Sequence, residues 1–144
     1  METIKLYEIK KNNTDFESVN LKSSYESSNF IRKFYGDDLE VYESFFILLL
    51  NRANDTIGYA KISQGGIVGT IVDVKIIAKY VVDSLASGII LAHNHPSGNK
   101  NPSQADLDIT KKIKEVLIYF DCKVLDHIIL TKNNYTSFAD ESLI

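Results

Sequence analysis

A short apolar segment, Gly88-Ile89-Ile90-Leu91-Ala92, directly precedes His93-Asn94-His95. This arrangement restricts both the secondary structure of the segment and the direction of the two histidine side chains. The length of this segment and its β-branched residues predict a strand that is buried in a sheet. Successive side chains of a strand point to opposite faces, so His93 and His95 should point the same way while Asn94 points away. The fold must therefore hold two imidazoles on one face at the end of a buried strand.

A carboxylate follows the two histidines after a short loop. Asp106 falls in the first turn of a predicted helix that begins at Ser103. Two imidazoles and one carboxylate are the usual protein ligands of a catalytic zinc ion, which keeps its fourth position for water. The pattern predicts a Zn²⁺ site made of His93, His95 and Asp106. A simpler interpretation of the last turn also fits, in which Ser103 caps the helix and Asp106 favours its positive end.

Hydrophobic periodicity predicts strands that alternate with helices along the chain. The predicted strands are residues 3–9 at a sheet edge, 41–50, 56–63, 67–74, 88–92 and 123–131. The predicted helices are one that is capped by Ser23 or Ser24 and stops at Gly36, one over residues 75–87 with Gly88 as its C-terminal cap, and one over residues 103–120. Such an order predicts an α/β protein in which helices cover a mixed β-sheet.

Composition narrows the classes of function. The chain has 144 residues, 44% of them hydrophobic, and a formal net charge of −3, which predicts one globular domain with its own core. A net negative charge gives no electrostatic basis for non-specific DNA binding, so it argues against direct nucleic-acid contact. The lone Cys122 predicts a buried thiol, because it has no partner for an internal disulfide. The longest apolar run, residues 45–50, is too short to cross a membrane, and no signal peptide follows Met1, which predicts a cytoplasmic protein.

Amide hydrolysis at such a zinc site also needs a general base, and Glu43 is the best candidate. Alternation places Val41, Glu43 and Phe45 on one otherwise apolar face of the predicted strand. A buried charge without a partner is costly, so a functional partner is a reasonable cause for this position. Glu43 can equally lie in solvent at the start of the strand, which leaves other acids of the same segment as rivals, namely Asp37, Asp38 and Glu40.

The pattern of the metal ligands resembles a known family. His-x-His-Pro, a short loop and Pro-Ser-x-x-Asp are similar to the JAMM signature of JAB/MPN metallopeptidase domains, and the string over residues 89–106 is most similar to the RadC branch. The resemblance covers about residues 37–144, while residues 1–36 are expected to add a strand and a helix that pack on this core. Further matching runs are Leu48-Leu49-Leu50-Asn51-Arg52, Lys61-Ile62-Ser63-Gln64-Gly65-Gly66, Leu125-Asp126-His127 and Ser137-Phe138-Ala139-Asp140.

The resemblance implies a three-layer α/β/α arrangement that is similar to cytidine deaminases. It also implies that Glu43 is the upstream catalytic glutamate and that Ser103 donates a hydrogen bond to the developing oxyanion. His127 matches the family pattern as well, but its position suggests no ligand role, and it is interpreted as a structural histidine. A zinc deaminase is excluded, because that site needs Pro-Cys-x-x-Cys and the chain has one cysteine. A cupin is excluded because its β-barrel does not accommodate two clear helices.

The sequence thus predicts a zinc-dependent metallohydrolase that cleaves peptide or isopeptide bonds in a peptide or protein substrate. One alternative is a metal-binding module that binds partners in DNA repair or DNA metabolism without turnover. Another is a metal-dependent enzyme that acts on nucleic acid, which the acidic composition disfavours. The sequence predicts no membrane association and gives no oligomeric state.

Overall fold

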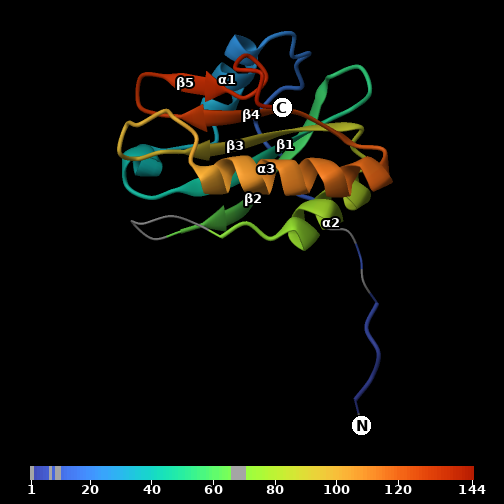
Figure 1. Cartoon of the computed structure of the whole chain (residues 1–144). Coiled ribbons are helices and arrows are strands. Elements are labelled where there is room, and N and C mark those ends of the chain that lie inside the picture. Colours follow the sequence, from blue (N-terminus) through green and yellow to red (C-terminus); the bar gives the residue numbers. More distant parts are fainter. Residues whose placement is uncertain (1, 7, 9–10, 66–70) are drawn as a thin grey trace.

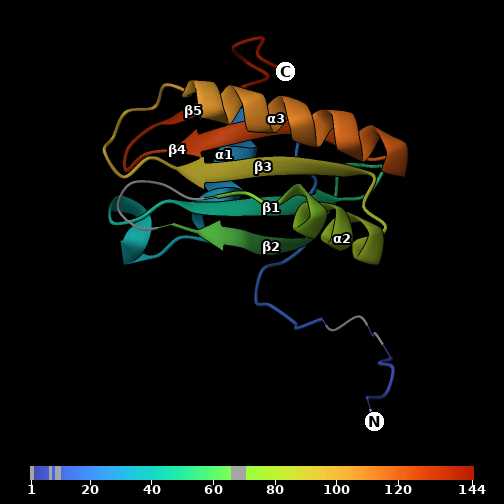
Figure 2. The same cartoon turned by 60° about the horizontal axis from the view of Figure 1, so that its bottom comes forward.

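A computed structural model describes residues 2–6, 8, 11–65 and 71–144 of the chain. The strands form one five-stranded sheet in the order β2-β1-β3-β4-β5 (Figure 2). Strands β3 and β4 are parallel, and the other neighbouring strands are antiparallel. In chain order the elements are α1 (Ser24–Arg32), the 3-10 helix η1 (Asp37–Glu40), β1 (Ser44–Leu50), β2 (Thr56–Gln64), α2 (Val74–Ser84), β3 (Gly88–Asn94), α3 (Gln104–Leu117), the 3-10 helix η2 (Ile118–Phe120), β4 (Lys123–Leu130) and β5 (Tyr135–Ser137).

Helices cover both faces of this sheet (Figure 1). Helices α2 and α3 lie on one face, where Ile77 and Ile113 pack among the buried side chains of β1 and β3. Helix α1 lies on the other face, where Ile31 packs in a second apolar cluster with Leu48 and Ala92. The predicted three-layer α/β/α arrangement around a mixed sheet is therefore confirmed.

The two central strands, β1 and β3, place the site at one end of the sheet and midway between its edges. Every residue of β1 and of β3 is buried, as expected for strands that are covered on both faces. Strand β2 pairs only with β1 among the described strands, and its burial alternates along its length. The continuous apolar run that precedes His93 therefore carries the two histidines to the centre of one sheet end.

Two predicted strands are corrected. Residues 3–6 and 8 belong to no strand and Ile4 is fully exposed, since alternation alone supplies no neighbouring strand to pair with; the rest of the predicted strand 3–9 lies outside the described residues. Residues 2–6 instead lie away from the sheet (Figure 1). Of the predicted strand 67–74, residues 71–73 are not extended in the sheet, and Val74 begins α2 because the Asp73 side chain caps the Lys75 amide. Residues 67–70 lie outside the described part.

Element boundaries differ from prediction at several places. The helix that was predicted to stop at Gly36 ends earlier, at Arg32. The strand predicted from residue 41 begins at Ser44, because η1 precedes it and leaves Val41 half exposed in a turn. Helix α2 ends at Ser84, where Leu85 rather than Gly88 adopts the left-handed conformation of the cap, with φ of 55°. Gly88 opens β3 instead, where a Cβ atom would come within 3.1 Å of the Leu125 side chain. The predicted helix 103–120 is α3 followed by η2.

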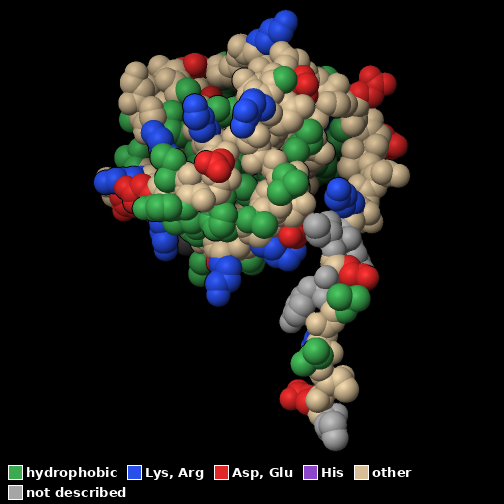
Figure 3. Space-filling view, turned by 90° about the vertical axis from the view of Figure 1, so that its right-hand side faces the viewer, with side chains coloured by type: hydrophobic (Ala, Val, Ile, Leu, Met, Phe, Trp, Pro, Cys, Tyr) green, Lys and Arg blue, Asp and Glu red, His purple; other side chains and the backbone are tan. Residues whose placement is uncertain are grey.

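The end of the sheet opposite the histidines is apolar on its surface. Figure 3 views this end, where hydrophobic side chains gather around the C-terminal ends of α2 and α3. Its exposed hydrophobic residues are Val82, Leu85, Ile118, Tyr119 and Phe120. Across the described residues, the longest helices fall short of the length and apolar character that a membrane crossing requires.

Candidate metal centre

The predicted site residues lie where three elements meet, at the end of β3 and at the starts of β1 and α3. His93 lies in β3, His95 follows directly, and Asp106 lies in the first turn of α3. Strands β1 and β3 are antiparallel with Phe45 opposite His93, so Glu43, two residues before Phe45, extends past the end of β3 toward His95. The alternation that placed Glu43 on the apolar face of Phe45 thus also places it on the histidine face.

Four polar side chains converge at this point. The Nε2 atoms of His93 and His95 are 2.9 Å apart. The Asp106 carboxylate spans both rings, with Oδ1 3.3 Å from Nε2 of His93 and Oδ2 3.3 Å from Nε2 of His95. Oε1 of Glu43 lies 3.8 Å from Nε2 of His95, and Glu43 forms a compact cluster of potential ligand atoms with the two histidines. The structure therefore brings together all the residues that were predicted as ligands and base.

These distances fit a tetrahedral metal ion. Ligand atoms that lie about 2.0–2.1 Å from a tetrahedral zinc ion are about 3.3–3.4 Å from one another. Each oxygen of Asp106 lies at this distance from one of the two imidazole nitrogens, and the 2.9 Å between those nitrogens is shorter. Two imidazole nitrogens and one carboxylate oxygen are also the donors that zinc prefers at a site with an open position.

The rival acids of the preceding segment lie elsewhere. Asp38 accepts a hydrogen bond from the Gly36 amide within its own turn. Glu40 is exposed and is paired with Lys132 at 3.6 Å. Within the described ranges, Glu43 is the acid of this segment that contacts the histidines.

Asn94 holds the chain that leads to Glu43. Its side chain points away from the two histidines, as the strand period predicts, and is fully buried. Nδ2 donates hydrogen bonds to the carbonyls of Leu39 and Tyr42, while Oδ1 accepts one from the Ser44 amide at 2.8 Å. These contacts fix the backbone on both sides of Glu43. Sequence reasoning did not find this role, because the bonds join residues that are about 50 positions apart in the chain.

Ser103 and Asp106 form a reciprocal cap at the start of α3. Ser103 Oγ accepts a hydrogen bond from the Asp106 amide at 3.1 Å, and Asp106 Oδ2 accepts one from the Ser103 amide at 2.8 Å. The capping interpretation is confirmed, and it fixes the orientation of the Asp106 carboxylate. Since Ser103 Oγ accepts in this pair, its own hydrogen can still be donated to another acceptor.

The loop after β3 determines which nitrogen of His95 faces the cluster. His95 Nδ1 lies 2.6 Å from the Asn99 carbonyl oxygen. A carbonyl only accepts, so Nδ1 carries a hydrogen, and the neutral ring presents the lone pair of Nε2 to the site. Gly98, with φ of +85°, supports the turn that brings Asn99 back to the ring.

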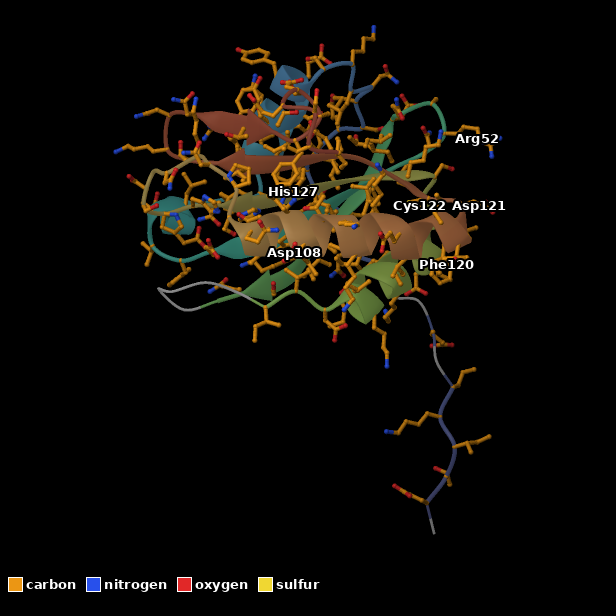
Figure 4. All side chains as sticks on the ribbon, in the orientation of Figure 1. Arg52, Asp108, Phe120, Asp121, Cys122 and His127 are labelled. Atoms are coloured by element: carbon orange, nitrogen blue, oxygen red, sulfur yellow. The ribbon has the colours of Figure 1, made fainter. Side chains whose placement is uncertain are left out.

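His127 of β4 is a further member of the cluster. It is completely buried, and its Nε2 lies 2.7 Å from Nδ1 of His93. Its Nδ1 lies 2.6 Å from the hydroxyl of Thr110 in α3. Figure 4 shows the ring of His127 between the sheet and α3. The sequence offered one signal for this contact, the Leu125-Asp126-His127 run of the resemblance, and no signal for Thr110.

Electrostatics in the cluster favour positive charge near Asp106. Burial acts to raise the pKa of Asp106, but the neighbouring His93 and His95 outweigh burial and hold this pKa well below its ordinary value. Burial acts to lower the pKa of His95, and contacts with Asp106, Asn99 and Glu43 outweigh burial and raise it. For His127, burial and the neighbouring His93 lower the pKa well below its ordinary value. The site therefore holds a carboxylate that is ready to pair with a cation.

Cys122 plays no part in this cluster. It lies beyond the far end of α3 from His127 (Figure 4). The thiol is buried, which raises its pKa to about 11. The predicted buried thiol is confirmed, and Cys122 does not supply a fourth ligand to close the site.

A known protein family matches the part of the chain that contains these residues. Residues 21–143 match the family described as RadC-like JAB domain. The chain is 52% identical over 102 residues to a UPF0758 protein of Flavobacterium johnsoniae, an alignment that covers 71% of this chain and 44% of that relative. It is 37% identical over 134 residues to a UPF0758 protein of Coprothermobacter proteolyticus, covering 92% of this chain and 57% of that relative.

A third relative is a UPF0758 protein of Porphyromonas gingivalis, which is 40% identical over 103 residues, or 71% of this chain and 45% of the relative. The chain thus spans about half the length of the curated relatives it matches. The name that these relatives carry states neither an activity nor a substrate.

Proposed function

The chain belongs to the RadC-like JAB domain family, and from this premise we propose that it is a zinc-dependent hydrolase of peptide or isopeptide bonds. One observation carries the proposal. The imidazoles of His93 and His95 converge with the carboxylate of Asp106, and a second carboxylate, that of Glu43, lies 3.8 Å from Nε2 of His95 on the same face. A metal that only stabilises the fold needs no such acid beside it, and a closed structural site takes four protein ligands.

In this proposal His93, His95 and Asp106 hold the ion. Zinc bound there supplies a Lewis acid that polarises the substrate carbonyl and acidifies water. The tautomer of His95 and the capping contacts of Asp106 present their ligand atoms before any ion arrives, so little reorganisation is needed on binding.

Glu43 is the general base of the proposed reaction. Its side chain is 24% exposed, so it contacts both solvent and the cluster. Oε1 takes a proton from the attacking water as the water oxygen bonds to the carbonyl carbon. Glu43 then returns that proton to the nitrogen as the carbon–nitrogen bond breaks, which leaves a carboxylic acid and an amine.

Ser103 stabilises the negative charge that develops on the carbonyl oxygen. Ser103 is exposed and directly precedes α3, where its hydroxyl contacts the amide of the proposed ligand Asp106. The hydrogen that remains after capping can be donated to the oxyanion. Ser103 thus caps the helix and serves the proposed reaction with different atoms of one hydroxyl group.

Metal analysis combined with two variants tests the proposal. Wild-type protein should hold one zinc ion per chain, and His95→Ala should hold far less. Glu43→Gln should keep its zinc and its fold but cleave a library of fluorogenic peptides and isopeptides more slowly by a factor of about 10²–10⁴, the usual contribution of a positioned base. Glu40→Gln is the matched control, because Glu40 lies in the same segment and contacts Lys132 instead.

Equal zinc content in wild type and His95→Ala would contradict the metal site. Undiminished cleavage by Glu43→Gln would contradict the base. A wild-type protein that binds zinc and cleaves no member of the library would favour the alternative, a metal-binding module that acts through partners in DNA metabolism.

A further inference from the structure

We infer that His127 and Thr110 are positioning residues, which set the hydrogen on His93 so that its Nε2 lone pair faces the metal. This inference rests on the proposed function, because it concerns how the same site receives its ion. The evidence is a continuous line of contacts that runs from His93 Nδ1 to His127, from His127 to Thr110, and from Thr110 to the backbone of Asp106.

The polarity of this line is fixed at one end. The Thr110 hydroxyl has one hydrogen, and it is donated to the Asp106 carbonyl oxygen at 2.6 Å, since a carbonyl cannot donate. The Thr110 oxygen must therefore accept from His127 Nδ1 at 2.6 Å. With its hydrogen on Nδ1, a neutral His127 presents the lone pair of Nε2 to His93.

The position of the hydrogen on His93 follows in the same way. His127 Nε2 accepts at 2.7 Å, so the hydrogen of His93 must lie on Nδ1. The Nε2 atom of His93 then carries a lone pair directed toward His95 and Asp106, which is the form that binds a metal. The orientation of the Thr110 hydroxyl thus selects the tautomer of His93, a proposed ligand that it reaches through His127.

Packing holds the intermediate ring in place. His127 is completely buried, its ring stacks on Phe138 with centroids 4.5 Å apart, and it meets Phe45 edge-on at 5.5 Å. A ring confined by two aromatic neighbours keeps both nitrogens in their contacts. A buried imidazole needs a polar partner at each nitrogen, and for His127 these partners are the proposed ligand His93 and Thr110.

The line also joins two ligands that come from different elements. His93 lies in β3, while Thr110 hydrogen-bonds to the backbone of Asp106 one helical turn earlier in α3. His127 in β4 bridges them. The arrangement therefore fixes the distance between the sheet ligand and the helix ligand as well as the tautomer. Partners of this kind typically contribute about 10–100-fold to metal affinity or activity.

The test is a comparison of zinc affinity among three threonine variants. Thr110→Val keeps the shape of the side chain but removes the acceptor for His127, and it should weaken zinc binding by about 10–100-fold in competition with a chromophoric chelator. Thr110→Ser restores the hydroxyl and should bind zinc close to the wild-type level. Thr56→Val is the control, because Thr56 is also buried and accepts a backbone hydrogen bond, but lies in β2.

Cobalt(II) spectra of the same proteins provide a readout other than activity. The visible absorption bands should change for Thr110→Val and stay unchanged for Thr56→Val, even where both variants lose similar thermal stability. A folded Thr110→Val protein with wild-type zinc affinity and cobalt spectrum would overturn the inference and leave the proposed function intact. A wild-type protein that binds no zinc would overturn both.

Discussion

Substitution of Asp126 tests how the strand that carries His127 is fastened to the end of the chain. Asp126 is 6% exposed, and its Oδ1 accepts hydrogen bonds from the amides of His127 at 2.7 Å and Ala139 at 2.9 Å. Its Oδ2 accepts one from the Ser137 hydroxyl. Asp126→Ala removes all of these acceptors.

The expected cost follows from the donors that remain. A buried donor that loses its partner costs about 1–3 kcal/mol. The His127 amide lies in the buried sheet and bears this cost fully, whereas Ala139 is exposed and its amide can bind water in part. Asp126→Ala should therefore lower the free energy of unfolding by about 2–4 kcal/mol. Asp126→Asn keeps Oδ1 for both amides and lets Nδ2 donate to Ser137, so it should cost less than about 1 kcal/mol.

The pH dependence separates the two substitutions further. Burial raises the pKa of Asp126 above its ordinary value of 3.8, despite hydrogen bonds that lower it. As pH rises through 3.8, the unfolded chain ionises before the folded one does, so wild type loses stability until the pH passes the raised pKa. Asp126→Asn lacks this loss, and its stability relative to wild type should improve between about pH 4 and about pH 7.

Urea unfolding followed by circular dichroism at both pH values measures these differences. The reasoning would be refuted if Asp126→Ala were as stable as wild type, or if Asp126→Asn became less stable relative to wild type as pH rises.

Further predictions concern the helix cap, the thiol and the metal. Ser103→Ala should lower the free energy of unfolding by about 1 kcal/mol and Ser103→Gly by only a few tenths, while both should slow hydrolysis by about 10²–10³-fold; kinetics that track stability would contradict the oxyanion role. Cys122, with its pKa raised to about 11, should react with iodoacetamide near neutral pH at least about 100-fold more slowly in the folded protein than in denaturant; equal rates would contradict its burial. Removal of metal by a chelator should abolish hydrolysis but preserve the circular dichroism spectrum, because apolar clusters on both sheet faces hold the fold; unfolding on chelation would contradict this expectation.

Local patterns predicted much of what positions the site. The β-branched run before His93 predicted β3, and strand alternation predicted that His93 and His95 share one face and that Glu43 shares the face of Phe45. Ser103 predicted the start of α3 through its capping chemistry. These inferences succeeded because each depends on residues that are close in the chain and on a backbone geometry that is the same in every strand or helix.

The errors and omissions involve contacts between distant residues. The alternation of residues 3–9 could not show whether a strand was available to pair with it. Gly88 was assigned to a helix cap, although the reason for glycine there is the close approach of Leu125 from β4. The contacts of Asn94 and the line from His93 to Thr110 likewise depend on how the strands are ordered in the sheet, which local periodicity does not encode.

The parallel pairing of β3 and β4 has a consequence for how the site is assembled during folding. Parallel neighbours require a crossover, and α3 lies within it, so His93 and His127 meet only after a separation of 34 residues has been closed. Non-local pairing of this kind forms slowly compared with a hairpin such as β1–β2. A nascent chain that has been synthesised only through α3 already carries His93, His95 and Asp106, but it lacks the strand that orients the first imidazole. Selective metal uptake is therefore expected only once β4 has joined the sheet.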